Sequence, residues 1–342
     1  MIKIDGSYGE GGGQIVRTSV ALAAITGQAC EIVNVRARRS KPGLQPQHLA
    51  AVKAAAEISD ATVRGGAVGS LFLAFEPTKR AKGGRYVFDI GTAGSATLVA
   101  QTVLVPLALS SAPSEVLIHG GTYNPHAPSF EFFEQVYLPA LAGMGVRAKA
   151  LSERAGYYPK GGGEIRLEIE PCSDLQPIHL PVRGPLQSLR ATIVTSELPD
   201  EVADRGSSTI ASSLPRAVLE VRRKPALGAG ASVHLTGVYE RAAVGFTALG
   251  ERGKRMERVA EDAIQLYQSF EASAGAVDEH LADQLVLPAA LACGPSLWTT
   301  AHATEHLRSV LWLVSQFLPV EAALEAGEVP TITMRPNPWT EA

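Results

Sequence analysis

The chain has few cysteines, few aromatic side chains and no excess of positive charge. Its 342 residues include three cysteines, Cys30, Cys172 and Cys293, which lie far apart. This number and spacing argue against a disulfide framework or a structural zinc site and favour a reducing compartment. With 31 basic and 34 acidic residues, a net charge of −3, the surface is not expected to coat a long nucleic-acid duplex. Aromatic residues amount to 6%, so recognition of a particular base sequence by stacking is not expected either.

Long apolar segments and targeting signals are also missing. The longest apolar run, Leu98–Leu109, is too short to span a bilayer and contains Pro106. The first residues, MIKIDGSYGEGGGQ, do not have the charged and then apolar order of a signal segment. Apolar residues make up 46% and charged residues 19%, which allows a sizeable core and excludes global disorder. We therefore expect a soluble, cytoplasmic protein with no membrane partner.

A pattern of elements repeats three times along the chain. Each copy predicts the order helix, strand, helix, strand, strand, and the copies cover residues 2–75, 94–169 and 281–334. One such layer cannot bury its apolar face alone, so the three copies are expected to pack together in an α/β (α+β) fold.

The stretch 182–277 breaks this period. It contains three further strand candidates and a helix with apolar residues at helical spacing from Met256 to Phe270. Its borders are rich in turn-forming residues. We predict a smaller inserted α/β domain at 182–277, and a large domain made of 1–181 and 278–342.

His306 is the first candidate for a catalytic group. Thr304 is a plausible N-cap, which places His306 in the first turn of a helix. The positive end of the helix dipole disfavours an imidazolium, and a neutral imidazole is the nucleophilic form. The same helix end favours a phosphate, so the position suggests attack on phosphorus. The alternative is an ordinary surface histidine near a helix start.

Two other patterns near charged loops remain open. His302 and His306 have the spacing of a helical zinc pair, but residues 301–304 are predicted to form a loop, which disfavours zinc. Residues 36–41 hold four cations, Arg36, Arg38, Arg39 and Lys41. They form either a solvated loop or a clamp for phosphate oxygens.

Two glycine runs, 9–14 and 159–164, match neither the P-loop nor the dinucleotide-binding pattern. Amides of the first run could approach a phosphate, and Glu10 within it could hold Mg²⁺ through oxygen. Asp283 and Gln284 either favour a helix dipole or contact a nucleotide. Gln101, in an apolar helix, either satisfies backbone groups or faces a cleft.

Taken together, these segments resemble the RNA 3′-terminal phosphate cyclases over nearly the whole length. The matching segments are DGSYGEGGGQIVR (5–17), RARRSKPGLQPQHLAAVKA (36–54), GTAGSATLVAQTVL (91–104), GGTYNPHAP (120–128), GYYPKGGGE (156–164), EHLADQLVLPAALA (279–292) and AHATEHL (301–307). The resemblance implies three βαβαββ units and a smaller inserted α/β domain.

The resemblance also implies an activity: ATP-dependent conversion of an RNA 3′-terminal phosphate into a 2′,3′-cyclic phosphate. A histidine attacks the α-phosphorus of ATP to form a histidine–AMP intermediate and releases pyrophosphate. AMP then passes to the RNA 3′-phosphate, giving RNA-3′-pp-5′-A. The neighbouring 2′-OH attacks the activated phosphate and AMP leaves, which explains a requirement for RNA rather than DNA.

Matching the motifs residue by residue implies roles for individual side chains. His306 is the implied nucleophile, and Glu10 the contact of Mg²⁺ (or Mn²⁺) or the triphosphate. The implied ATP contacts are Gln101, His280, Leu281, Ala282, Asp283 and Gln284. The implied contacts of the phosphate or RNA end are Arg17, Arg36, Arg39, Gln47 and His48.

This sequence departs from the family pattern at two positions. Tyr123 stands where a small polar residue such as Asp is expected in the GGT-x-NP motif, and His280 stands where an aromatic such as Tyr is common. Stacking on adenine at position 280 would then use an imidazole.

Two other functions compete with the enzyme. One is a non-catalytic, cyclase-like protein that binds RNA in ribosome assembly. The other is a sugar-type transferase built from similar repeats. The presence of His306 and of the ATP segment favours the enzyme, because non-catalytic relatives lack the histidine.

Overall fold

The computed structural model describes residues 1–336 and contains three units with the same topology. The first unit consists of β1 (Ile2–Asp5), α1 (Gly13–Thr26), β2 (Cys30–Val33), α2 (Pro46–Ser59), β3 (Thr62–Arg64) and β4 (Leu73–Glu76). The second consists of β5 (Arg85–Asp89), α3 (Ala96–Ala108), β6 (Ser114–Gly120), α4 (Phe130–Phe132), η1 (Phe133–Tyr137), α5 (Leu138–Gly143), β7 (Ala148–Leu151) and β8 (Gly163–Ile169). The third consists of β9 (His179–Leu180), α8 (Glu279–Gln284), α9 (Val286–Ala290), β14 (Ser296–Thr299), α10 (Glu305–Phe317), β15 (Val320–Glu325) and β16 (Thr331–Pro336).

The sheets repeat the same strand order, which confirms the predicted βαβαββ units. The orders are β1-β2-β4-β3, β5-β6-β8-β7 and, read from the other edge, β9-β14-β16-β15. In each unit the first two strands are parallel, and a helical crossover joins them. The last two strands of each unit pair antiparallel.

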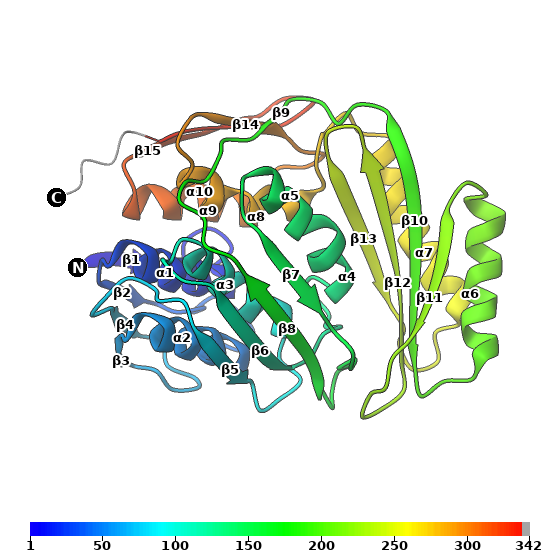
Figure 1. Cartoon of the computed structure of the whole chain (residues 1–342), viewed down its shortest axis with the longest axis horizontal. Coiled ribbons are helices and arrows are strands. Elements are labelled where there is room, and N and C mark those ends of the chain that lie inside the picture. Colours follow the sequence, from blue (N-terminus) through cyan, green and yellow to red (C-terminus); the bar gives the residue numbers. More distant parts are fainter. Residues whose placement is uncertain (337–342) are drawn as a thin grey trace.

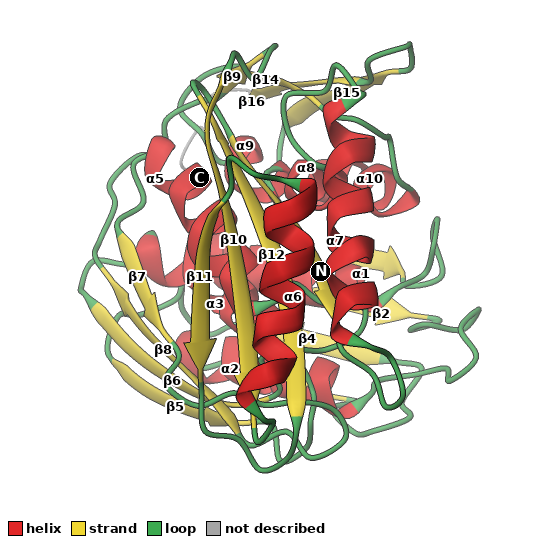
Figure 2. Cartoon of the chain, turned by 90° about the vertical axis from the view of Figure 1, so that its right-hand side faces the viewer, coloured by secondary structure: helices red, strands yellow, loops and turns green. Residues whose placement is uncertain are grey.

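Helices occupy the centre of the three-unit body, and the sheets lie around them (Figures 1 and 2). Helix α1 packs on α2, α3 and α10, so it contacts helices of all three units. Its alanines and small residues are buried, and Leu22, Val99 and Val310 are exposed by 2% or less. Burial of apolar area of this kind stabilises the body by roughly 25 cal/mol per Å². None of the helices in residues 1–336 is long and apolar enough to cross a membrane.

The structure corrects several element boundaries. The helix expected over 130–144 contains a π-turn, η1, and the helix expected over 281–292 is divided into α8 and α9 at Leu285. Pro139 and Pro288 lie in these helices and cannot donate a backbone hydrogen bond. Strands β5 and β9 were not predicted individually, since β5 lies at a sheet edge and β9 has two residues.

A fourth sheet, with the order β11-β10-β12-β13, interrupts the third unit between β9 and α8. Its elements are β10 (Leu186–Ser196), α6 (Asp200–Ser213), β11 (Val218–Arg223), β12 (Gly230–Tyr239), β13 (Ala243–Leu249) and α7 (Met256–Glu271). Helices α6 and α7 pack on one face of the sheet around a separate cluster that includes Ile193, Val233 and Val259. We propose residues 182–277 as the inserted domain, called the insertion below.

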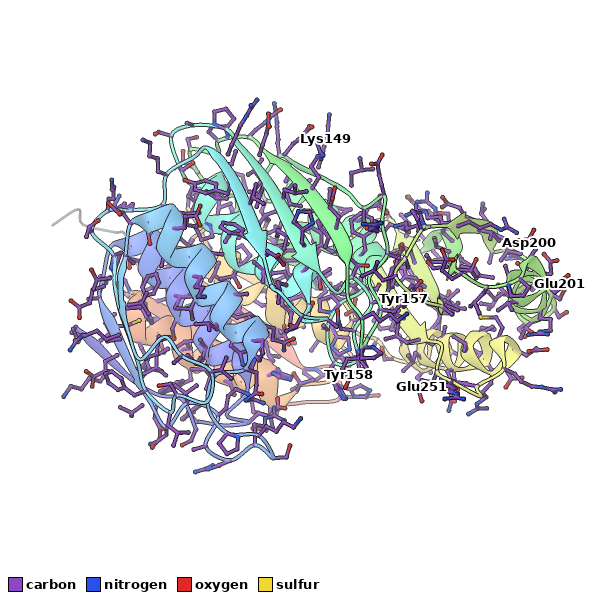
Figure 3. The ribbon with its side chains drawn as sticks, turned by 90° about the horizontal axis from the view of Figure 1, so that it is seen from below. Lys149, Tyr157, Tyr158, Asp200, Glu201 and Glu251 are labelled. Carbon is purple, nitrogen blue, oxygen red and sulfur yellow. The ribbon has the colours of Figure 1, made fainter. Side chains whose placement is uncertain are left out.

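The other face of the fourth sheet rests on the second unit through polar contacts. Glu131 is fully buried, and its Oε1 lies 3.8 Å from Arg222 Nη1 and 3.6 Å from Lys224 Nζ of the insertion. Tyr123 Oη donates to the same carboxylate at 2.8 Å, and its ring stacks on Tyr157 with centroids 4.9 Å apart. The tyrosine at position 123 is therefore a core residue of this junction, which Figure 3 shows around Tyr157 and Tyr158.

Arg183 holds together the two chain segments that lead into and out of the insertion. Its guanidinium donates to the carbonyls of Phe270, Glu271 and Gly275 at 2.9 to 3.4 Å. It also lies over the Phe270 ring, 4.6 Å from the centroid. The Arg183 side chain is 16% exposed, so these contacts form away from bulk water.

Replacing Arg183 by methionine should therefore destabilise the junction by about 2–4 kcal/mol, because carbonyl groups lose a charged donor. Urea unfolding followed by fluorescence measures the loss. Arg147→Met is the matched control, since that side chain is 82% exposed. Equal unfolding midpoints for the two variants would contradict the role assigned to Arg183.

Candidate active site

The first turn of α10 presents His306. Thr304 is the N-cap, and its Oγ1 accepts a hydrogen bond from Leu307 N at 3.1 Å. The side chain of His306 is 43% exposed, and it lines a cavity. His302 precedes the helix in a loop, so the two histidines do not share a helical face.

The glycine-rich loop between β1 and α1 lies against α10. The Tyr8 ring stacks on Trp312 of α10, with centroids 3.9 Å apart and planes 15° apart. Gly9 has φ +54°, and a Cβ there would overlap the Ser309 hydroxyl, so the close approach requires glycine. This docking brings Glu10 to His306, with Oε2 2.8 Å from Nε2.

Glu10 also pairs with Arg39, so one carboxylate joins a histidine of the third unit to an arginine of the first. Burial lowers the pKa of His306, and Arg17, Arg39 and His280 lower it further, while Glu10 acts in the opposite direction. The net result is a pKa below the ordinary 6.5, which favours the neutral ring at neutral pH.

The five residues expected at the phosphate or RNA end do not all face His306. Arg17 and Arg39 are close enough to influence its charge. Arg36 donates to the carbonyls of its own loop, at Lys41 (2.6 Å) and Gly43 (2.9 Å). The Arg36 side chain therefore stabilises the loop of residues 36–43.

The other two lie on α2. The His48 ring packs against Gly13, and its Nδ1 accepts from Gln45 N at 3.1 Å. Burial, with help from Arg17 and Arg36, lowers the pKa of His48 to about 3, so the ring is neutral. Gln47 Oε1 accepts from Ser95 N at 3.4 Å and so reaches the second unit.

A cavity of about 1600 Å³ lies between the three-unit body and the insertion. The expected ATP-contact residues that line it are Gln101, His280, Asp283 and Gln284. Leu281 and Ala282 are instead packed in the core, exposed by 1% and 0%. The Gln101 amide Nε2 and the Gln284 carbonyl Oε1 are buried without a hydrogen-bond partner among residues 1–336. Such atoms on a cavity wall are groups that a polar ligand would satisfy.

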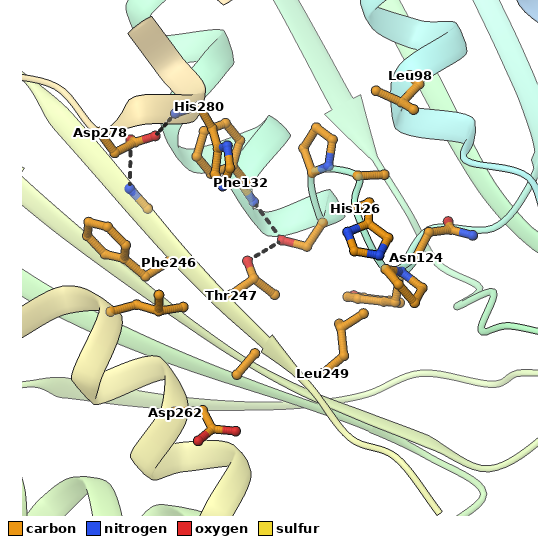
Figure 4. Close-up of a pocket in the computed structure, with 18 of the residues that line it drawn as sticks. Leu98, Asn124, His126, Phe132, Phe246, Thr247, Leu249, Asp262, Asp278 and His280 are labelled. Carbon is orange, nitrogen blue, oxygen red and sulfur yellow. Dashed lines mark hydrogen bonds between the residues drawn. The ribbon is translucent and has the colours of Figure 1, made fainter. Parts of the chain in front are cut away.

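His280 is well placed to contact a flat ligand. Its side chain is 67% exposed, and its ring meets Phe132 edge to face at 6.5 Å (Figure 4). Asp278 caps α8 by accepting from His280 N and Leu281 N at 3.0 and 2.9 Å. Its other oxygen accepts from Gly245 N of β13 at 3.3 Å, which ties this wall of the cavity to the insertion.

Asp283 is a buried carboxyl in the same wall, 8% exposed. Burial raises its pKa to about 7, although His280, Gln14 and Arg17 act in the opposite direction. Burial also lowers the pKa of Arg17 to about 10. The carboxyl and the guanidinium thus influence each other's charge in a poorly solvated region beside His306.

Several residues at the site were not found from the sequence. The Tyr8–Trp312 stack pairs distant positions, and no local pattern points to it. Asp278 has the signal of an N-cap before a helix, which could have identified it. The strand β13, which forms one wall of the cavity, was not predicted as a strand.

The fold and site define a class of α/β proteins: three βαβαββ units with an inserted domain and a histidine on the cavity between them. The family model of the RNA 3′-terminal phosphate cyclases matches residues 8–324. An RNA 3′-terminal phosphate cyclase of Methylococcus capsulatus is 44% identical over 93% of this chain and 91% of its own length. The cyclase of Ralstonia nicotianae is 45% identical over 95% of this chain and 94% of its own length. That of Gloeothece citriformis is 42% identical over 93% of this chain and 93% of its own length. The chain belongs to the RNA 3′-terminal phosphate cyclase family, and it is an enzyme of that family.

The raised pKa of Asp283 predicts a pH dependence of stability. The folded protein keeps the proton up to about pH 7, whereas the unfolded chain releases it near pH 3.8. Stability from this group is therefore lost as pH rises toward 7, with a full effect on the order of 4 kcal/mol. Asp283→Asn should therefore raise the free energy of unfolding by most of that amount at pH 8 and by much less at pH 5. Urea unfolding at the two pH values measures the difference.

The control for this prediction is Asp204→Asn on α6, where the carboxyl is exposed. It should change stability little at either pH. An equal effect of Asp283→Asn at pH 5 and pH 8 would show that the carboxyl has an ordinary pKa in the folded protein.

Proposed function

We propose that the protein converts the 3′-terminal phosphate of RNA into a 2′,3′-cyclic phosphate with ATP, through a histidine–AMP intermediate on His306. The observation that carries the proposal is the place of His306. It lies at the start of α10, on a cavity, beside Arg39 and Glu10. Its neutral ring supports nucleophilic attack, and the helix start and nearby guanidinium groups support binding of a triphosphate.

In the first step His306 attacks the α-phosphorus of ATP. A nitrogen–phosphorus bond forms, the bond to the bridging oxygen breaks, and pyrophosphate leaves with the electron pair. His280 would stack on adenine through its exposed ring, and Gln101 and Gln284 would use their unpartnered amide atoms on the nucleotide. Positioning and charge neutralisation then supply most of the catalysis.

Mg²⁺ or Mn²⁺ fits this site only together with the triphosphate. Glu10 is the carboxylate beside His306, and no group of three or more His, Cys, Asp or Glu in residues 1–336 could hold a metal ion alone. Mg²⁺ commonly uses one or two carboxylates and completes its shell with substrate phosphates and water. When bound, the ion would neutralise phosphate charge, with Glu10 as its protein ligand.

In the later steps AMP passes from His306 to the RNA 3′-phosphate, giving RNA-3′-pp-5′-A. The neighbouring 2′-OH attacks that phosphorus, closes the ring and expels AMP. Arg17 and Arg39 would hold the RNA phosphate near His306, and Gln47 and His48 would support this region from α2. The cysteines Cys30, Cys172 and Cys293 are free thiols, which supports a location of the protein in the reducing cytoplasm.

His306→Ala should reduce covalent labelling by α-labelled ATP and Mg²⁺ to background, because no other neutral imidazole stands at the helix start. The wild-type label should be acid-labile and base-stable, as expected for a phosphoramidate. His302→Ala is the matched control, since it removes a histidine from the same cavity and should keep the label.

Wild-type labelling in His306→Ala would exclude this residue as the nucleophile. A wild-type protein that takes no label but binds structured RNA would instead favour the non-catalytic, RNA-binding alternative.

A further inference from the structure

The cavity is larger than one nucleotide needs. Sites for a single small ligand occupy about 300–1,000 Å³, and this one measures about 1600 Å³. The residues assigned to ATP come from α3 and α8, next to His306. A further part of the lining comes from the loop after β6, the loop before β8 and the end of β13, and no role has been given to it.

Asn124, in the loop after β6, is one of the residues that line this part of the cavity. The residue is 9% exposed and lines the cavity. Its Nδ2 donates to the Ala93 carbonyl, which fixes the amide orientation. Its Oδ1 is buried and has no partner among the described residues. A ligand with a hydroxyl or amino group would supply the missing donor.

Two flat side chains, His126 and Tyr158, line the same cavity as Asn124. His126 has φ +61°, a left-handed conformation that is rare outside glycine and that often marks a functional loop. Figure 4 shows its ring next to Asn124, while His280 lies beside Phe132. Tyr158 is 72% exposed and lines the same cavity. Leu249 of the insertion adds an apolar surface.

A chain of contacts links this part of the cavity to the proposed RNA-phosphate site. Gln47 Oε1 accepts from Ser95 N, and a Cβ on Gly94 would lie 3.0 Å from the Gln47 side chain. Ala93, next in the same loop, accepts from Asn124. Gln47 and Asn124 therefore contact the same short loop, residues 93–95, which places them near each other.

We propose that Asn124, His126, Tyr158 and Leu249 form the subsite for the 3′-terminal nucleoside of the RNA substrate. This inference rests on the proposed function. His126 and Tyr158 stack on the base, which tolerates any base because each has a π-face. Asn124 Oδ1 accepts one hydrogen bond from the nucleoside. The insertion thus supplies one wall of the RNA site through Leu249.

The test separates RNA binding from ATP chemistry. The variants are His126→Ala and Tyr158→Ala, both at exposed positions where folding should be unaffected. The Kd for a short 3′-phosphorylated RNA, measured by fluorescence anisotropy, should rise about tenfold in each variant. Labelling by α-labelled ATP without RNA should stay within about twofold of wild type. His126→Phe and Tyr158→Phe should keep stacking and restore RNA binding.

His179→Ala is the matched control, because this exposed histidine lies on β9 and does not line the cavity. RNA affinity within twofold of wild type in both alanine variants would overturn the subsite. So would an equal loss of labelling, since the two rings would then serve ATP. If wild-type protein takes no label yet both variants lose RNA affinity, the subsite stands and the histidine–AMP mechanism fails.

Discussion

The site depends on one carboxylate that joins the first and third units. Glu10 contacts His306 on one side and Arg39 on the other. The glycine loop that carries Glu10 reaches α10 only because Gly9 allows a close approach and Tyr8 stacks on Trp312. Helix α1, which follows the glycine loop, packs against helices of all three units and so fixes the position of that loop relative to α10. The polar contacts of His306 are thus a consequence of how the helical centre packs.

The insertion contributes to the cavity, although His306 belongs to the third unit. Its strand β13 forms a wall of the cavity, and Asp278 ties that wall to the helix that carries His280. The junction with the second unit is polar, with Glu131 between Arg222 and Lys224. Removing one member of such a buried group leaves an uncompensated charge, which is more costly than losing an apolar contact. The arrangement therefore fixes one orientation of the insertion over the cavity.

Repetition and helix-capping patterns predicted much of this structure from the sequence. The three units followed from their repeated order, and the start of α10 followed from Thr304 because an N-cap acts locally. The contact between Glu10 and His306 could not be predicted from spacing, because it joins two units that meet only in the folded chain. The bracing role of Arg36 also depends on backbone carbonyls of its own folded loop. Strand β5 was not predicted because it lies at a sheet edge and exposes both polar and apolar residues, so its sequence has no clear alternation.

The insertion separates β9 from the strand with which it pairs, β14. During synthesis on a ribosome, β9 leaves the exit tunnel long before its neighbour exists, and α10 emerges after both strands. The first two units can each complete a sheet from contiguous chain, whereas the third cannot. A nascent polypeptide therefore acquires His306, and the third sheet, only after the whole insertion has been synthesised.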